Sequence, residues 1–459
     1  MSYEALIASK SAVLDFSGIE GVQLGDYFFP HQADLTRWAL RRGRAAIFAD
    51  TGLGKTAMQL EWAKHVSAHG RVLILTPLAV AQQTVAEGKR FGIETKYARH
   101  DTGAPIVVTN YEMFHAFDPS RFVGIVLDES SILKAFDGRT RTALIQGFAQ
   151  TPYRLACTAT PAPNDFTELG NHSEFLGIKT RSEMLSEFFA HDGGSTQDWR
   201  IKGHAVRPFW TWVATWGAVL RLPSDLGHED NGFRLPPIEM HEHVIPIDDH
   251  DAAATGMLFA MDAQTLNEQR AVRRGTTGKR ADLVARLADH AEPAVVWCEL
   301  NAEADAMEAA IPGAIQVRGA DDMDTKIERL TGFSSGKYRV LVTKPSIAGH
   351  GLNWQHCAHV IFAGVSHSYE QTYQAIRRCW RFGQTRPVRV DMIRAETEGM
   401  VMANYRRKEA DAARMASDML EHVRESMCAQ VRGTGRKFNP YNPRKAIVVP
   451  AWIGMEESA

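Results

Sequence analysis

The sequence predicts an α/β protein made of two parallel-sheet domains in tandem, with a helical, aromatic-rich insertion between them. Short, continuous apolar runs alternate with amphipathic stretches in two separate parts of the chain. Apolar strands set between helices form parallel sheets that are covered on both faces. The alternation stops between Asp165 and Leu235, and a chain of 459 residues is too long for one ordinary core.

The first domain is predicted over residues 1–165. Its expected strands are Ala45–Phe48, Val72–Leu75, Ile106–Thr109, Val123–Leu127 and Tyr153–Cys157. In an open parallel sheet, ligands collect at the carboxyl ends of the strands. Two motifs, described below, follow the first and the fourth of these strands. The binding site of this domain is therefore expected at that edge of the sheet.

The insertion is predicted over residues 166–235. Phe209, Trp212 and Trp216 recur at helical spacing, which predicts a buried stripe. The second domain follows over residues 236–426, and a basic, Pro-containing tail occupies residues 427–459. The expected strands of the second domain lie near Val295–Cys298, Ala314–Val317, Val340–Thr343, Val360–Phe362 and Val388–Ile393.

Composition is that of a globular protein, with 44% hydrophobic and 23% charged residues. The formal net charge is −2, so nucleic-acid binding would have to come from local basic patches. The five cysteines are scattered without a Cys-x-x-Cys pattern, which fits reduced thiols. The chain shows no signal-peptide pattern and no apolar run of about eighteen residues. We expect a soluble, cytoplasmic protein with no membrane contact.

A glycine-rich loop, A-D-T-G-L-G-K-T, runs from Ala49 to Thr56 between an expected strand and an expected helix. This is the setting of a phosphate-binding loop, although the strict pattern has glycine at the position of Ala49. The N–H groups of such a loop and the N-terminus of its helix attract anions. Lys55 would reach the β- and γ-phosphates of a nucleotide, and Thr56 would bind Mg²⁺. The alternative is an ordinary Gly-rich turn.

An acidic pair, Asp128-Glu129, directly follows the strand Val123–Leu127. At such a position one carboxylate can hold Mg²⁺ while the other orients an attacking water. The alternative is a solvated acidic turn. The pair lies about seventy residues after the glycine loop, which favours the functional interpretation.

A hydroxyl-rich turn, Thr158-Ala159-Thr160-Pro161, follows the last strand of the first domain. Its threonines can hydrogen-bond the acidic pair and transmit the state of that pair to neighbouring loops. Thr-x-Thr-Pro also forms ordinary turns.

Arg378 and Arg381 lie three residues apart, and therefore on one face of an expected helix. Two guanidinium groups directed across a cleft suit the charge of a transferring γ-phosphoryl group. The alternative is a basic face that contacts DNA phosphates or solvent.

Together these motifs resemble those of superfamily-two helicases, and within them the Swi/Snf-type DNA translocases. Thr160–Leu169 resembles the T-P-x-x-N-x-x-x-E-L motif of that branch, and Ala348–Asn353 resembles its glycine-rich G-L-N motif. Gln374–Gln384 resembles its Q-A-x-x-R-x-x-R-x-G-Q motif, and Pro30-His31-Gln32 resembles the adenine-reading glutamine motif. The motifs occur in the order of the family. The compact length is similar to that of phage and prophage helicase-like proteins.

The chain departs from the family pattern at several positions. Arg377 stands where the family usually has glycine, and Trp380 stands where it often has histidine. The stretch Phe362-Ala363-Gly364 lacks an acid that many relatives carry. These departures concern coupling between the lobes rather than ATP hydrolysis.

The resemblance implies two tandem RecA-like lobes that bind ATP and Mg²⁺ at their cleft. Gln32 would read the base. The phosphates would be held by Thr51, Gly52, Leu53, Gly54, Lys55 and Thr56, the metal by Thr56 and Asp128, and the expected catalytic residues are Lys55, Asp128, Glu129, Arg378 and Arg381.

The activity implied by the resemblance is that of a DNA-dependent ATPase, a translocase or helicase acting on duplex or branched DNA without sequence preference. Family members commonly work as monomers, and replication or recombination proteins are candidate partners. Two alternatives stay open. One is an RNA helicase, and the other is a non-translocating, ATP-gated DNA clamp that recruits such a partner.

By the same resemblance, both lobes contact the backbone of one nucleic-acid strand away from the ATP cleft. Groups of this kind position the strand without reading its sequence. The candidates at or directly after strand ends are Thr76, Pro77, Thr109, Asn110, Thr343 and Lys344, and those in the insertion are Arg200, Lys202 and Arg207. The aromatic residues of the insertion could also grip the second strand or wedge a junction, but packing is the favoured interpretation for most of them. Thr and Asn after strands are also ordinary turn residues.

Overall fold

The computed structural model of the chain describes residues 18–134, 138–162, 165–191, 199–247, 266–348, 352–366 and 368–432. Pro163, Asn164, Gly349, His350 and Gly351 of the family-like motifs lie outside the described residues, as do residues 433–459 of the predicted tail. Among the described residues, no helix combines the length and the apolar character needed to cross a membrane.

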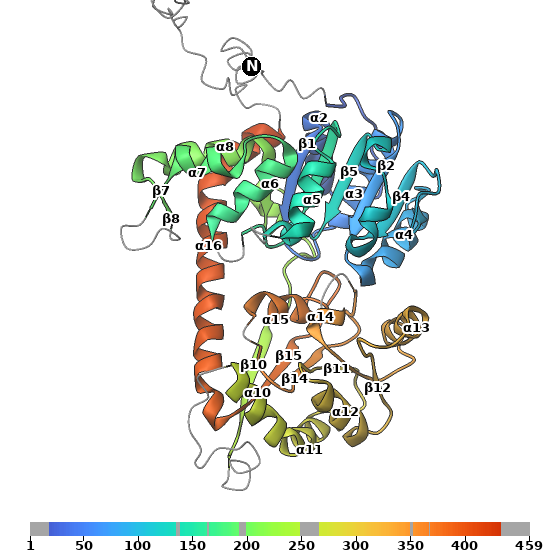
Figure 1. Cartoon of the computed structure of the whole chain (residues 1–459), viewed down its shortest axis with the longest axis vertical. Helices are drawn as coiled ribbons and strands as arrows, with labels where there is room; N and C mark the ends of the chain where they lie inside the picture. Colours follow the sequence, from blue (N-terminus) through green and yellow to red (C-terminus); the bar gives the residue numbers. More distant parts are fainter. Residues whose placement is uncertain are drawn as a thin grey trace, which may run out of the picture.

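Lobe one, the first α/β domain, contains a seven-stranded sheet in the order β3-β4-β2-β5-β6-β1-β9 (Figure 1), and all neighbouring strands run parallel. The five strands predicted from apolar runs are confirmed, and the residues of these runs are buried except for Val123 and Tyr153, which are half-buried. The strands are β1 (Arg44–Ala49), β2 (Val72–Thr76), β3 (Lys96–Tyr97), β4 (Ile106–Asn110), β5 (Gly124–Asp128), β6 (Tyr153–Cys157) and β9 (Gly217–Leu220). Its helices are α2 (Pro30–Arg42), α3 (Lys55–Ser67), α4 (Ala81–Arg90), α5 (Arg139–Gly147) and α6 (Leu169–Leu176).

The segment predicted as an insertion contributes to lobe one. Its strand β9 pairs in parallel with β1, at the edge of the first sheet. The helices α7 (Arg181–Phe188) and α8 (Val206–Trp216) flank a two-stranded antiparallel hairpin of β7 (Phe189–His191) and β8 (Trp199–Ile201). The predicted aromatic stripe is confirmed as packing, since Phe209, Trp212 and Trp216 are buried in the core of lobe one.

Lobe two contains a six-stranded parallel sheet in the order β10-β15-β14-β11-β13-β12. Its strands are β10 (Ile238–Ile245), β11 (Ala294–Trp297), β12 (Ala314–Gln316), β13 (Val340–Thr343), β14 (His359–Phe362) and β15 (Val388–Ala395). Its helices are α10 (Leu266–Gly275), α11 (Thr277–Leu287), α12 (Asn301–Ala310), α13 (Met323–Ser334), α14 (Pro345–Ala348) and α15 (Tyr369–Ile376). The predicted strands of the second domain are confirmed, and the fold is that of two parallel-sheet lobes, as tandem RecA-like domains require.

A single long helix, α16 (Gly399–Val431), runs beside both lobes (Figure 1). With 33 residues it is about 50 Å long. Val401 and Tyr405 near its start are buried in lobe two, whereas Val423 and Met427 near its end are buried in the core of lobe one. The helix therefore connects the two cores mechanically.

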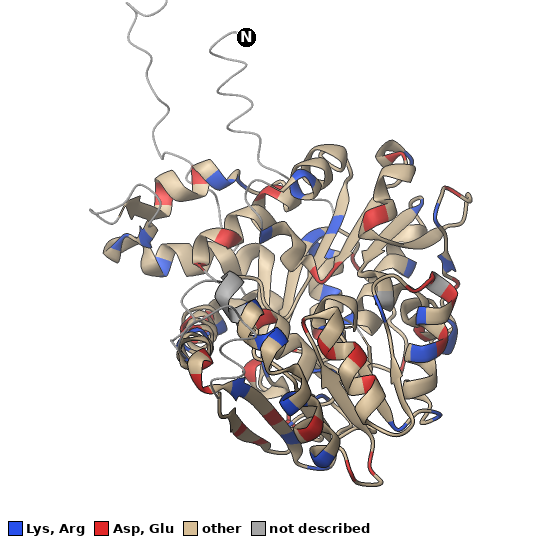
Figure 2. Ribbon diagram, turned by 60° about the horizontal axis from the view of Figure 1, so that its bottom comes forward, with Lys and Arg blue, Asp and Glu red and all other residues tan. Residues whose placement is uncertain are grey.

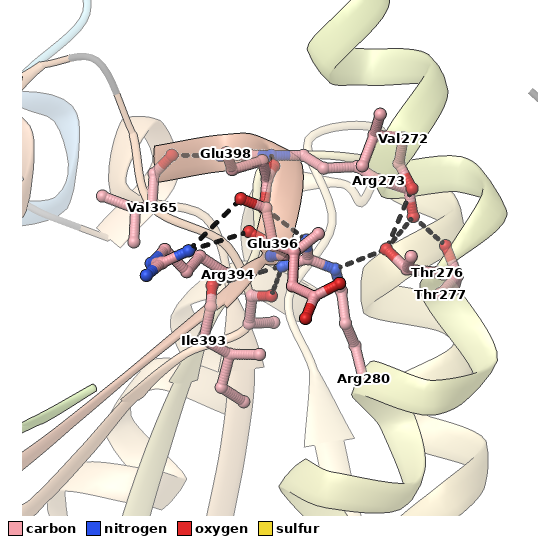
Figure 3. A network of polar contacts seen from close by, with 12 residues as sticks. Val272, Arg273, Thr276, Thr277, Arg280, Val365, Ile393, Arg394, Glu396 and Glu398 are labelled. Atoms are coloured by element: carbon pink, nitrogen blue, oxygen red, sulfur yellow. Dashed lines mark hydrogen bonds and ion pairs between the residues drawn. The ribbon is translucent and has the colours of Figure 1, made fainter. Parts of the chain in front are cut away.

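A buried ionic network fixes the start of this helix to lobe two (Figure 3). Arg273 Nε and Arg280 Nη2 lie 3.1 and 2.5 Å from the two carboxylate oxygens of Glu398, the residue before α16. Arg280 also donates to the carbonyl oxygen of Ala363 at 2.6 Å. Buried charges are tolerated when they are paired and hydrogen-bonded in this way, and removing one partner is costly.

Candidate functional site

The glycine loop joins the end of β1 to the start of α3, as its sequence predicts. Gly52 and Gly54 have φ angles of +92° and +83°, which residues with a Cβ rarely adopt. A Cβ on Gly52 would lie 2.8 Å from the backbone nitrogen of Phe382 in lobe two, and a Cβ on Gly54 would lie 2.2 Å from Nε2 of Gln32. Conformation therefore requires glycine at both positions, and at Gly52 the close approach of the Phe382 backbone requires it as well.

Lys55 is the first residue of α3, and its ammonium group folds back over the loop. Its Nζ donates to the carbonyl oxygens of Ala49 at 2.8 Å and Asp50 at 3.3 Å. Thr51 Oγ1 is buried and has no hydrogen-bond partner among the described residues. The helix N-terminus, the lysine and this hydroxyl offer donors of the kind that a phosphate group requires.

Gln32 touches the glycine loop directly. Its Nε2 donates to the carbonyl oxygen of Leu53 at 3.1 Å, and its Oε1 accepts from the backbone N–H of Phe29 at 3.2 Å. Both ends of the amide therefore hold backbone groups, which anchors the loop to α2. Recognition of a base by Gln32 stays a prediction.

Asp128 ends β5 and is buried. Its Oδ1 accepts a hydrogen bond from Nε2 of Gln59 on α3 at 2.7 Å. Burial, with the neighbouring carboxylate of Glu129, raises the pKa of Asp128 to about 6. A buried carboxylate beside a second one is a natural oxygen ligand for a divalent cation, which would offset both charges.

Glu129 is the only non-glycine residue with positive φ in the described part of the chain, at 54°. Such a conformation is costly for a residue with a Cβ, and it occurs most often at functional sites. Thr158 Oγ1 donates to Glu129 Oε2 at 3.4 Å, and Tyr111 donates its hydroxyl to the carbonyl oxygen of Asp128 at 2.7 Å. The turn is thus held from both sides.

Two residues of α6 that the sequence did not single out also hold this acidic turn. His172 Nε2 lies 3.1 Å from Ser130 Oγ, and Asn171 Nδ2 donates to the carbonyl oxygen of Leu133 at 2.8 Å. Both side chains are buried. A run of four polar residues, Asn171 to Glu174, between the apolar ends of this helix was the available signal for this role.

Of the two predicted arginines of lobe two, Arg378 is buried and Arg381 is half-buried beside the same turn. Arg378 donates from Nη2 to Gln374 Oε1 at 3.0 Å, and Arg381 donates from Nη1 to the carbonyl oxygen of Leu352 at 3.2 Å. Burial lowers the pKa of Arg378 to about 10 and that of Arg381 to about 9, while the Glu129 carboxylate opposes the shift at both. Arg381 Nε has no partner among the described residues.

The segment that carries these arginines lies directly on the glycine loop. Phe382 is in contact with Gly52, as described above, and Arg377 forms an ion pair with Asp50. Phe382 also stacks on Phe233 of the connection between the lobes, with ring centroids 4.5 Å apart. The structure therefore brings the glycine loop and the acidic pair of lobe one together with the arginine segment of lobe two.

A cavity of about 890 Å³ lies between the lobes beside this site. Pro77, Tyr111 and Glu129 line it from lobe one, and Ile327 and Asn353 line it from lobe two. The phosphate-loop residues described above are not among its lining residues. The cavity thus reaches the acidic turn but not the glycine loop.

The predicted nucleic-acid contacts differ in exposure. Pro77 and Lys344 are half-buried, and Lys202 donates to the carbonyl oxygens of Ser186 and Glu187 at 2.7 and 3.0 Å. The fully buried candidates are Thr76, Thr109, Asn110 and Thr343, and the exposed ones are Arg200 and Arg207. Two of the buried hydroxyls, on Thr76 and Thr343, donate to backbone carbonyls.

In the part of the chain that the structure describes, surface charge does not mark a track for nucleic acid. Figure 2 shows acidic and basic residues interspersed over both lobes, in agreement with the net charge of −2. The hairpin of β7 and β8, which carries Arg200, lies at the end of lobe one opposite to α4 (Figure 1). The contacts predicted in the insertion and those after the strands thus lie on separate parts of lobe one.

Comparison with known proteins gives one match. Residues 279–383 match the family model described as the helicase conserved C-terminal domain. This part of lobe two is similar to the C-terminal domain of helicases. The match spans β11 to α15 together with Arg378 and Arg381, and it ends at Gly383. It indicates a helicase-like, nucleic-acid-dependent ATPase that uses ATP, typically with Mg²⁺. None of the curated proteins compared with the chain matches it.

Proposed function

We propose that this protein is an ATP-dependent DNA translocase or helicase of the Swi/Snf-type branch. It hydrolyses ATP at the cleft between its two lobes and moves on duplex or branched DNA. The observation that best supports the proposal is the contact between Gly52 of the glycine loop and Phe382 in the arginine segment. A phosphate group held by one lobe would lie next to guanidinium groups of the other.

The residues fit distinct roles in this reaction. Lys55 and the N–H groups of the loop hold the β- and γ-phosphates. Thr56 and Asp128 would bind Mg²⁺, which neutralises charge on the phosphates when it is bound. Glu129 orients the attacking water and takes up its proton as the bond to the leaving ADP breaks.

Arg378 and Arg381 stabilise the charge of the transferring phosphoryl group from lobe two. Arginine fingers of this kind accelerate phosphoryl transfer by about 10³–10⁵, or roughly 4–7 kcal/mol of activation free energy. Because they belong to the other lobe, their stabilisation depends on closure of the cleft. Alternate closing and opening, while both lobes hold a DNA backbone, would produce stepwise movement.

The primary test is ATP hydrolysis measured with and without DNA, using wild-type protein, Glu129→Gln and Glu112→Gln. Glu112 is exposed and lines the same cavity, so its variant is the matched control. We expect DNA to stimulate the wild type and the control, and Glu129→Gln to bind ATP without turnover. Equal rates with and without DNA would refute a DNA-dependent motor, and turnover by Glu129→Gln would refute the role of Glu129.

Two further measurements separate the proposal from its alternatives. Stronger stimulation by RNA than by DNA would favour an RNA helicase. Displacement of a third strand from triplex DNA distinguishes a motor, which removes the strand, from an ATP-gated clamp, which leaves it in place.

A further inference from the structure

One face of α15 and its C-cap makes three hydrogen bonds or ion pairs with the catalytic loops of lobe one. Glu370, Tyr373 and Arg377 are spaced three and four residues apart: Glu370 is in the first turn of the helix, Tyr373 is in its second turn and Arg377 is its C-cap. Residues at this spacing lie on one side of a helix. Each of the three makes a polar contact with a loop of lobe one.

The C-terminal end of this face holds the glycine loop. Arg377 donates from Nη2 to Oδ2 of Asp50, and Tyr373 donates its hydroxyl to Oδ1 of the same carboxylate at 3.0 Å. Arg377 Nε also donates to the Tyr373 oxygen at 3.0 Å. The Arg377 guanidinium lies 4.4 Å from the centroid of the Trp380 ring, and the Arg377 side chain is only 6% exposed. Breaking such a buried pair leaves a buried charge without a partner, which is strongly unfavourable.

The N-terminal end of the same face holds the acidic turn. Glu370 forms an ion pair with Lys134, the last residue of the turn Ser130–Lys134 that follows Glu129. The polarity of this pair is opposite to that of the first, since lobe two here supplies the acid. The two contacts thus fix both the position and the direction of α15 on lobe one.

We propose that Glu370, Tyr373 and Arg377 form a clamp that fastens the glycine loop and the acidic turn to lobe two, and that this clamp slows the release of bound nucleotide. This inference rests on the proposed function, because that function supplies the nucleotide whose release the clamp slows. The clamp joins protein groups to each other, so it stabilises the closed cleft whether or not nucleotide is bound. The three side chains are positioning residues, because they act through the loops that they hold.

The position of Arg377 distinguishes this clamp from the arginines assigned to hydrolysis. The family pattern usually has glycine there, and a glycine would leave Asp50 without its ionic partner in lobe two. Arg378 and Arg381, in contrast, donate to groups within lobe two. The clamp is therefore a property of this chain that the family motif does not supply.

The clamp can be tested with two measurements on the full chain. Fluorescence energy transfer between labels at Lys89→Cys on α4 and Asp324→Cys on α13 reports the separation of the lobes, because both helices line the cavity between them. The other cysteines are buried except Cys428, which is replaced by Ser. The dissociation rate of a fluorescent ADP analogue in Mg²⁺ buffer reports nucleotide release.

Arg377→Gln is expected to increase the label separation and to accelerate ADP release about tenfold. Tyr373→Phe should act in the same direction with a smaller effect. Lys134→Glu and Glu370→Lys should each accelerate release, and the double charge exchange should return it to within about twofold of wild type. Arg386→Gln is the control, since Arg386 pairs with Glu292 within lobe two and should change neither readout.

The outcomes are distinguishable. Unchanged label separation and release in Arg377→Gln and in both single charge reversals would overturn the clamp. Failure of the charge exchange to rescue would overturn the role of Glu370. A wider label separation together with no binding of ADP by any variant, wild type included, would support the clamp as a lobe contact and refute the proposed function. If Arg377→Gln fails to fold, Tyr373→Phe and the charge exchange decide.

Discussion

His172 Nε2 lies 3.1 Å from Ser130 Oγ, at a position where the imidazole has no exposure to solvent. This contact ties α6 to the acidic turn of lobe one. It also places a titratable ring where its charged form is poorly solvated. Burial lowers the pKa of His172 to about 4, whereas an unfolded chain gives about 6.5.

The first prediction is a loss of stability in mild acid that depends on His172. Between about pH 6.5 and pH 4 the unfolded chain binds a proton at this ring and the folded chain does not, so the free energy of unfolding falls as the pH falls. The loss is absent above about pH 6.5 and reaches at most about 3 kcal/mol near pH 4.

Urea unfolding of wild type and His172→Gln at several pH values in this window checks this prediction. The glutamine carbonyl can accept a hydrogen bond from Ser130, so the variant should fold. The slope of its free energy of unfolding against pH should be smaller than that of wild type by about one proton taken up on unfolding. The exposed His204 provides the control variant His204→Gln, which should behave as wild type. Parallel curves for wild type and His172→Gln would contradict the assignment.

The second prediction concerns the backbone of Glu129. At φ 54° a Cβ is unfavourable by about 1 kcal/mol relative to glycine. Glu129→Gly should therefore be about 1 kcal/mol more stable than Glu129→Ala, although both lose hydrolysis. The exposed Glu328 in the helix α13 is the control position. There Glu328→Ala should be more stable than Glu328→Gly by about 1 kcal/mol, which is the opposite order. Chemical denaturation of the four variants measures both differences, and the same order at both positions would argue against strain at Glu129.

The sequence was sufficient to predict features that depend on local pattern. Buried parallel strands are continuous apolar runs, so the strands from Ala45–Phe48 to Val388–Ile393 could be located before the structure was known. The glycine loop and the acidic pair could be placed because each follows such a strand, and strands of one parallel sheet end at a common edge.

Features that depend on how distant segments dock could not be predicted in this way. The strand β9 is four residues long, and it lies in a helical, aromatic segment, so nothing local joined it to β1. The pairs Arg377–Asp50 and Lys134–Glu370 exist only because the lobes face each other. A hydroxyl at the end of a strand, such as that of Thr343, looks the same in sequence whether it faces a ligand or a backbone carbonyl.

The third prediction separates packing from nucleic-acid contact on α8. Trp212 is buried against Phe188 and Trp216, with ring centroids 5.3 Å away in both cases, so Trp212→Ala should reduce the free energy of unfolding by about 3–5 kcal/mol. Arg207 is exposed on the same helix, so Arg207→Ala should change the free energy of unfolding by less than about 0.5 kcal/mol. If Arg207 contacts a phosphate, Arg207→Ala should also reduce the salt dependence of DNA binding by about one counterion. An unchanged salt slope would remove Arg207 from the DNA contacts.

The last prediction tests the contact between the lobes at the glycine loop. Gly52→Ala places a methyl group 2.8 Å from the backbone nitrogen of Phe382. A backbone atom cannot move aside as the end of a flexible side chain can. The segment carrying Arg378 and Arg381 must then move away from the loop. Because stabilisation by these arginines requires close approach, ATP hydrolysis should fall more than tenfold, a loss above about 1.4 kcal/mol of transition-state stabilisation.

The control for this variant is Gly103→Ala. Gly103 also has a positive φ, +75°, but a Cβ there would meet nothing within 4 Å. It therefore carries the same kind of backbone strain without the collision between lobes, and it should retain hydrolysis. If Gly52→Ala hydrolyses ATP as fast as Gly103→Ala, the two lobes do not need this contact for catalysis. The arginines of lobe two would then have to act from a different arrangement of the lobes.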